Sequence, residues 1–186
     1  PKSVWPRTGG VLCDEVAKIT MGDASDFTNF MTAVIDQRVF DKITGYIERA
    51  KASDTCEVVV GGGSDDSEGW FIEPTIIVTS YPKAESMVEE IFGPVATVHP
   101  FKDEAEALAL ANDTAFGLSG SVWTSDMIRA RRFAEKMETG MVWVNTWLHR
   151  DLRVPFGGVK DSGVGREGGR WSLGFFSEAV NICVKS

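Results

Sequence analysis

The chain has 186 residues, 43% of them hydrophobic, and a formal net charge of −8. This is enough for one domain with a sizeable core, and the hydrophobic content excludes a disordered chain. No apolar run approaches the length of a membrane span and the charge is negative, so we expect neither a membrane nor a nucleic acid among the partners.

In chain order, the first part of the sequence predicts two helices and a hairpin. Residues 10–19 are weakly helical. Asp36 can cap a helix whose apolar side chains recur every three or four residues, at Val39, Ile43, Ile47 and Ala50. Residues 58–60 predict a short strand, and the Gly-, Ser- and Asp-rich stretch 61–69 predicts a turn. Residues 71–78 then form the expected return strand.

From residue 95 onward, predicted strands and helices alternate. The expected elements are a strand at 95–98, a helix at 103–111, a strand at 121–123, a helix at 126–138, a strand at 141–144, an irregular stretch at 146–168, a helix near 170–175 and an alternating strand through Val180, Ile182 and Val184. This order predicts an α/β fold with a parallel-type sheet flanked by helices. We expect the last strand, which follows a glycine-rich segment, to pair outside the main sheet.

Cys13, Cys56 and Cys183 form an odd, widely spaced set that fits neither a disulfide framework nor a metal site. They favour a reducing compartment, the cytoplasm or the mitochondrial matrix. With only two histidines in the chain, we expect no metal site.

The segment 89–95 pairs two acidic residues with an aromatic and a Gly-Pro turn, just before a predicted strand. One interpretation is a solvated helix end followed by a turn, and spacing alone favours it. The other places a carboxylate and an aromatic ring at the mouth of a sheet, where α/β proteins bind ligands.

Five segments, taken together, resemble a known protein family more specifically than any one of them alone. They are GWFIEPT at 69–75, EEIFGPV at 89–95, ANDTAFGLSG at 111–120, GMVWVN at 140–145 and PFGGVKDSGVGRE at 155–167. In this order they resemble the C-terminal half of the NAD(P)-dependent aldehyde dehydrogenases, over essentially the whole chain. The resemblance implies a catalytic-domain fragment at 1–176 and an oligomerisation strand at 177–186, and hence a homo-oligomer.

The resemblance also assigns roles to individual residues. Glu90 would accept hydrogen bonds from the nicotinamide ribose of NAD, with NADP possible, and Phe92 would lie against the nicotinamide ring. Asn145 and the loop after it would line the aldehyde tunnel, and Phe156 would close its wall.

The family's nucleophile is a cysteine that attacks the aldehyde. By resemblance it belongs upstream of Pro1, and none of the three cysteines lies in its motif, so we expect no catalytic residue within this chain. The rest of the dehydrogenase polypeptide is then a required partner, and the 186 residues alone should be inactive. The alternative is a non-catalytic subunit or interaction module.

Two subfamilies compete for the substrate. Residues 1–100 resemble 1-pyrroline-5-carboxylate dehydrogenase, which oxidises glutamate semialdehyde. Residues 140–186 resemble the 2-hydroxymuconic and 2-aminomuconic semialdehyde dehydrogenases. Both imply an aldehyde that carries a carboxylate, and Arg150 and Arg153 offer charge-assisted hydrogen bonds for one. The alternative is that one or both arginines are solvated loop residues.

Overall fold

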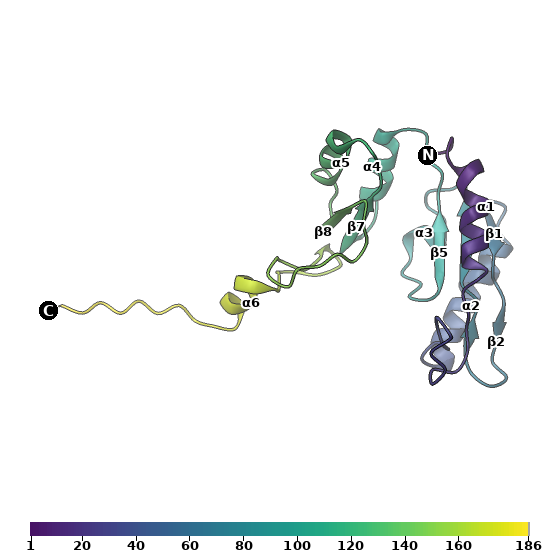
Figure 1. Cartoon of the computed structure of the whole chain (residues 1–186), viewed down its shortest axis with the longest axis horizontal. Coiled ribbons are helices and arrows are strands. Elements are labelled where there is room, and N and C mark those ends of the chain that lie inside the picture. Colours follow the sequence, from purple (N-terminus) through teal and green to yellow (C-terminus); the bar gives the residue numbers. More distant parts are fainter. Residues whose placement is uncertain (186) are drawn as a thin grey trace. The chain divides into compact units, whose positions relative to one another are not determined.

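The computed structural model describes residues 1–185, and the chain divides into two compact units with the boundary between Asp103 and Glu104 (Figure 1). The elements of the first unit are α1 (Trp5–Val16), α2 (Gln37–Lys51), β1 (Cys56–Val60), β2 (Ser64–Asp65), β3 (Phe71–Ile72), β4 (Thr75–Thr79), α3 (Glu85–Val88) and β5 (Val95–Val98). Strands β1, β4 and β5 form a mixed sheet in that order, with β1 antiparallel and β5 parallel to β4.

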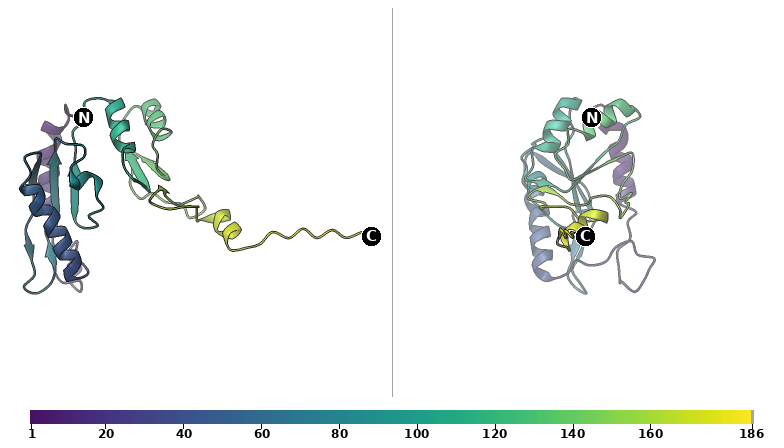
Figure 2. Two further views of the ribbon diagram at one scale, coloured as in Figure 1. Left: turned by 180° about the vertical axis from the view of Figure 1, so that it is seen from behind. Right: turned by 90° about the vertical axis from the view of Figure 1, so that its left-hand side faces the viewer.

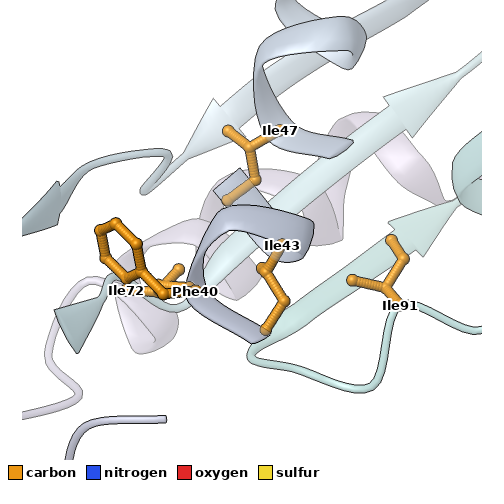
Figure 3. Packing of buried hydrophobic residues seen from close by; sticks show 5 residues of the cluster. All are labelled: Phe40, Ile43, Ile47, Ile72 and Ile91. Atoms are coloured by element: carbon orange, nitrogen blue, oxygen red, sulfur yellow. The ribbon is translucent and has the colours of Figure 1, made fainter. Parts of the chain in front are cut away.

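Helix α2 forms where the sequence predicts it. The carboxylate of Asp36 accepts a hydrogen bond from the backbone N–H of Val39 at 2.8 Å, which satisfies one of the free donors of the first turn. The apolar face is buried at Phe40, Ile43, Ile47 and Ala50. Figure 3 shows this face packed against Ile72 of β3 and Ile91. Burial of these side chains is the main stabilising contribution in this part of the unit.

Two predictions in the first unit need correction. Helix α1 begins at Trp5 rather than near residue 10, because Pro6 occupies its first turn, where the missing N–H of proline costs nothing. The predicted return strand 71–78 is broken into β3 and β4. Pro74 lies at the break, and a proline cannot donate to a strand ladder.

The second unit contains α4 (Glu104–Asn112), β6 (Phe116–Gly117), β7 (Ser119–Val122), α5 (Met127–Ala134), β8 (Met141–Val144), β9 (Val159–Lys160) and α6 (Gly169–Phe175). Strands β7 and β8 pair in parallel, with α5 between them in the chain, whereas β6 and β9 pair antiparallel. The α/β fold class is therefore confirmed. Its parallel pairing occurs as separate pairs, β4–β5 and β7–β8, each within one unit.

Helix α5 ends at Ala134, four residues before the predicted end at 138. The side-chain amide of Asn112 explains the early stop. It donates to the carbonyl of Lys136 and accepts from the N–H of Glu138, both at 2.9 Å. These bonds hold the chain after α5 in a non-helical course.

The predicted final strand is not formed within the described chain. Residues 177–185 run beyond α6 without a paired strand, and Val180, Ile182 and Val184 are all exposed (Figures 1 and 2). A strand needs a partner for its backbone hydrogen bonds, and this unit offers none here. Pairing with another subunit stays a prediction. No helix within residues 1–185 has the length and apolarity needed to cross a bilayer.

Candidate functional site

The turn that joins α3 to β5 is held from three sides. The side chain of Ile91 is buried in the cluster formed by α2. A Cβ added to Gly93 would lie 2.3 Å from Cδ1 of Ile43, so only glycine fits without movement of the core. The carbonyl of Pro94 accepts from the N–H of Thr75 at 2.8 Å, which ties the end of the turn to β4. The turn is thus fixed to the hydrophobic core.

Glu90 and Phe92 flank the buried Ile91, and both are exposed. The ring of Phe92 is 82% exposed, and its backbone has a φ of +59°. A bulky residue in this left-handed region costs about 1–3 kcal/mol, and such residues cluster at ligand-binding sites. An aromatic ring held in water on a fixed, strained turn is a surface ready to receive a flat apolar group.

Lys42 is part of this site, and the sequence analysis missed it. Its Nζ donates to the backbone carbonyl of Glu90 at 2.7 Å, from the solvent-facing side of α2. In the sequence, the only sign of this role is that Lys42 directly precedes Ile43, a core residue of α2 that packs near the turn. Lys42 thus holds the main chain of Glu90.

One expectation about this turn is wrong. In the register of β4 and β5, Thr75 pairs with Val95, so the turn enters the amino end of the parallel pair. Open α/β sheets bind ligands at the carboxyl ends of their strands. The sheet rule therefore does not support the site, and the roles of Glu90 and Phe92 rest on the motif and on the turn's own geometry.

In the second unit, Asn145 directly follows β8 and is tied to the backbone of Thr124. Its Oδ1 accepts from the N–H of Thr124 and its Nδ2 donates to the carbonyl of Thr124, each at 2.8 Å. Asn145 also has a positive φ of 53°, which asparagine tolerates better than most residues. The amide thus extends the β7–β8 pairing by one step and directs the start of the following loop. Its predicted contact with substrate stays a prediction.

The loop at 146–153 is anchored through aromatic residues. Nε1 of Trp143 donates to the carbonyl of His149 at 2.8 Å. The ring of Trp147 meets that of Trp143 edge to face, with centroids 4.9 Å apart. These contacts fix the loop backbone next to Arg150.

The two loop arginines have different surroundings. The guanidinium of Arg150 lies 4.0 Å from the ring centroid of Phe156, a cation–π contact, and within the described residues no carboxylate pairs with it. Arg153 instead forms a two-pronged bond with Asp151, through Nε at 2.9 Å and Nη2 at 2.5 Å. Hydrogen bonds from Arg153 lower the pKa of Asp151 below its ordinary value, and the same bond raises the pKa of Arg153.

Arg150 and Phe156 both line a hollow of about 610 Å³ in the second unit. Trp143, Leu152 and Ser172 form other parts of its wall, whereas Asn145 and Arg153 do not line it. The structure therefore brings together two of the four predicted substrate residues. Of the two arginines, only Arg150 lines the hollow, whose wall also includes Asp151 and Glu167.

The cysteines lie elsewhere. Cys13 is in α1, Cys56 begins β1 and Cys183 lies in the C-terminal segment, and all three are free. None belongs to the Glu90 turn or to the loop at 146–153.

The family follows from a direct comparison. The family model described as the aldehyde dehydrogenase family matches residues 1–182. The chain belongs to the aldehyde dehydrogenase family. It is 43% identical over 188 residues to the 2-aminomuconic 6-semialdehyde dehydrogenase of a Pseudomonas species, covering 99% of this chain and 38% of that protein. It is 40% identical over 172 residues to the 2-hydroxymuconic semialdehyde dehydrogenase of Pseudomonas putida, covering 90% of this chain and 35% of that protein.

Solved structures of this family have the same fold. The betaine aldehyde dehydrogenase of Staphylococcus aureus in complex with NAD⁺ matches with a TM-score of 0.87 and 35% identity, over 98% of this chain and 39% of that one. HpcC from Thermus thermophilus matches with a TM-score of 0.91 and 36% identity, over 95% of this chain and 36% of that one. The chain thus spans between a third and two fifths of these relatives.

These comparisons confirm the predicted family and its resemblance to the muconic semialdehyde dehydrogenases. The relatives named muconic semialdehyde dehydrogenase match across the first 100 residues as well. The predicted resemblance of that region to 1-pyrroline-5-carboxylate dehydrogenase finds no support in them.

Proposed function

We propose that the complete protein containing this chain is an NAD(P)-dependent aldehyde dehydrogenase, with NAD as its cofactor, that oxidises a carboxylate-bearing semialdehyde of the muconic type to the acid. The observation that carries this proposal is the fixed turn presenting Glu90 and Phe92, which lies within the family motif. The relatives named for muconic semialdehydes and a neighbour solved with NAD⁺ support it.

The exposed residues of the turn fit the cofactor. The carboxylate of Glu90 can accept hydrogen bonds from two ribose hydroxyls at once, and the ring of Phe92 offers an apolar face to the nicotinamide. Lys42 keeps the Glu90 backbone in place. When bound, NAD accepts the hydride released by the aldehyde carbon. These residues orient that exchange, and the nucleophilic cysteine is supplied by the part of the polypeptide outside this chain.

For the substrate, Arg150 is the residue suited to bind the remote carboxylate, with Phe156 closing the wall beside it. Asn145 directs the loop, and Arg153 holds it through Asp151. Glutamate semialdehyde also carries a carboxylate and serves as a second test substrate. The free cysteines support a cytoplasmic or mitochondrial-matrix location.

The test compares Arg150→Ala with Arg153→Ala in the complete protein. We expect Arg150→Ala to raise KM for 2-hydroxymuconic semialdehyde about ten- to a hundredfold, as for a lost charged hydrogen bond. Propanal, which has no carboxylate, should lose little. Arg153→Ala, which breaks an exposed ion pair, should change kcat/KM by at most about fivefold.

Three substrates are compared by kcat/KM: 2-hydroxymuconic semialdehyde, glutamate semialdehyde and propanal. Equal losses on all three would assign Arg150 a folding role and remove the support for a carboxylated substrate. A larger loss in Arg153→Ala than in Arg150→Ala would reverse the assignment of the two arginines.

A further inference from the structure

Helix α2 carries a second row of side chains beside its buried face. Figure 3 shows Ile43 and Ile47 on the side of α2 that packs in the core. The second row consists of Lys42, Tyr46 and Arg49, and each of these stands one position before a buried residue of the helix. Their spacing of four and three residues places them on one face of α2. This row makes the contacts of α2 with polar groups of the segment 85–90.

The segment 85–90 is attached to this row near both of its ends. Nε of Arg49 donates to Oε2 of Glu85, at the start of α3, at 2.8 Å. Nζ of Lys42 donates to the carbonyl of Glu90, beyond the end of α3, at 2.7 Å. The ring of Tyr46 contacts both cations, because its centroid lies 4.7 Å from Cζ of Arg49 and 5.9 Å from Nζ of Lys42. One aromatic ring thus supports the two attachments.

Helix α3 cannot fix its own position. It has four residues, and no side chain caps its first turn. A helix this short does not form alone, because its first turn fixes several residues for one hydrogen bond. Its position therefore depends on tertiary contacts, which are the Arg49 bond to Glu85 and a 2.9 Å bond from Thr97 to the carbonyl of Ser86. The N–H of Glu89 donates to the carbonyl of Glu85 at 3.0 Å, so a shift of α3 reaches the turn at 89–95.

We propose that Arg49 and Tyr46 are positioning residues for the cofactor. The bond from Arg49 to Glu85, supported by the ring of Tyr46, holds α3 where the carboxylate of Glu90 can reach the nicotinamide ribose. This role rests on the proposed function, in which Glu90 binds that ribose. Arg49 and Tyr46 belong to the first unit, whereas the loop at 146–153 belongs to the second. Loss of either residue should therefore affect NAD and leave the aldehyde unaffected.

The test measures NAD affinity by calorimetry in the complete protein and in its variants Arg49→Met and Tyr46→Leu. The side chains of Arg49 and Glu85 are 55% and 46% exposed, so each variant should weaken NAD binding only about two- to fivefold. Tyr46→Phe keeps the ring face and should bind NAD normally. Arg38→Met is the matched control, because Arg38 lies on the same helix and pairs with Asp36 at 3.9 Å.

A second readout separates positioning from a folding effect. The KM for 2-hydroxymuconic semialdehyde at saturating NAD should stay unchanged in Arg49→Met and Tyr46→Leu. A variant that only destabilised the fold would lower kcat through a smaller active fraction and leave the NAD affinity of the folded molecules as it was. A matching rise in the KM for the aldehyde would overturn the positioning role. So would an equal loss of NAD affinity in Tyr46→Phe and Tyr46→Leu, for Tyr46.

Glu85→Gln completes a double-mutant cycle. If Arg49 acts through Glu85, the double variant should weaken NAD binding no more than either single variant does. Additive losses would overturn the role of Arg49. Unchanged affinity in Arg49→Met, where Glu90→Gln does weaken NAD binding, would overturn that role and leave the proposed function standing. Unchanged affinity in Glu90→Gln would overturn both.

Discussion

At Phe92, the sequence motif predicts the role of the residue, but only the structure shows its backbone conformation. The motif EEIFGPV predicts that this aromatic belongs to a cofactor site, but nothing in the sequence predicts its φ of +59°. Phenylalanine avoids the left-handed region on its own. Its conformation follows from tertiary contacts, namely the burial of Ile91 and the tight fit of Gly93 against Ile43. The motif therefore points to Glu90 and Phe92 as candidates, whereas neither the geometry of the turn nor the contact from Lys42 could be predicted from the sequence.

Glu90 gives the residue-scale prediction. In the complete protein, Glu90→Gln keeps the size of the side chain but removes its charge, so each ribose hydrogen bond weakens by roughly 1–2 kcal/mol. NAD should bind more weakly, and hydride transfer should slow because ring placement sets the reaction geometry. NAD affinity and single-turnover hydride transfer measure the two effects. Glu89→Gln, an exposed neighbour with the same charge change, is the control. Normal values of both quantities in Glu90→Gln would show that Glu90 does not contact the cofactor.

At the scale of elements, the sequence predicts best where the signal is local. Helix α2 has its cap and its apolar periodicity within one segment, and β8 is a single apolar run. The end of α5 was misjudged because the amide of Asn112, distant in sequence, takes up backbone groups after the helix. The pairing partners of the short strands are likewise set by contacts that no local pattern contains.

The cap of α2 supports a stability prediction. Asp36→Ala leaves the N–H of Val39 without its acceptor and should lower the free energy of unfolding by about 1 kcal/mol. Asp36→Asn keeps an equally good cap, so it should change the stability much less. Urea unfolding followed by circular dichroism gives both values. Equal losses in the two variants would mean that charge, not capping, is the contribution of Asp36.

The C-terminal segment has the pattern of a strand but no partner within the described chain. Val180, Ile182 and Val184 alternate with Asn181, Cys183 and Lys185, so they would share one face of a strand formed with another subunit. Deletion of residues 178–186 from the complete protein should lower its oligomeric mass, measured by light scattering. Asn181→Ser, on the opposite face, should leave the mass unchanged. Retention of the full mass after deletion would rule out this segment as the oligomerisation strand.

At the scale of the whole molecule, the chain exposes many large apolar side chains. This is expected of a chain that spans only part of its relatives' length. Large apolar side chains such as Phe27, Phe30, Phe175 and Phe176 are mostly exposed, more than a stable monomer's surface requires. We expect the rest of a longer polypeptide, or further subunits, to cover them.

The intact mass of the natural protein separates the two main alternatives. A mass near 20 kDa favours a non-catalytic module, and more than twice that mass favours the enzyme.

The 186-residue chain alone should not oxidise aldehydes. The reaction needs a thiolate within reach of both the aldehyde carbon and the nicotinamide, because the hydride leaves only from the adduct that the thiolate forms. Cys13, Cys56 and Cys183 belong to α1, β1 and the C-terminal segment, and none lies on the turn or loop assigned to cofactor and substrate. The check is NADH formation by the pure chain with 2-hydroxymuconic semialdehyde, glutamate semialdehyde or propanal, beside the complete protein as the active reference. NADH production above the protein-free rate that disappears when the three cysteines are replaced by serine would overturn this prediction. It would also place the nucleophile within these residues.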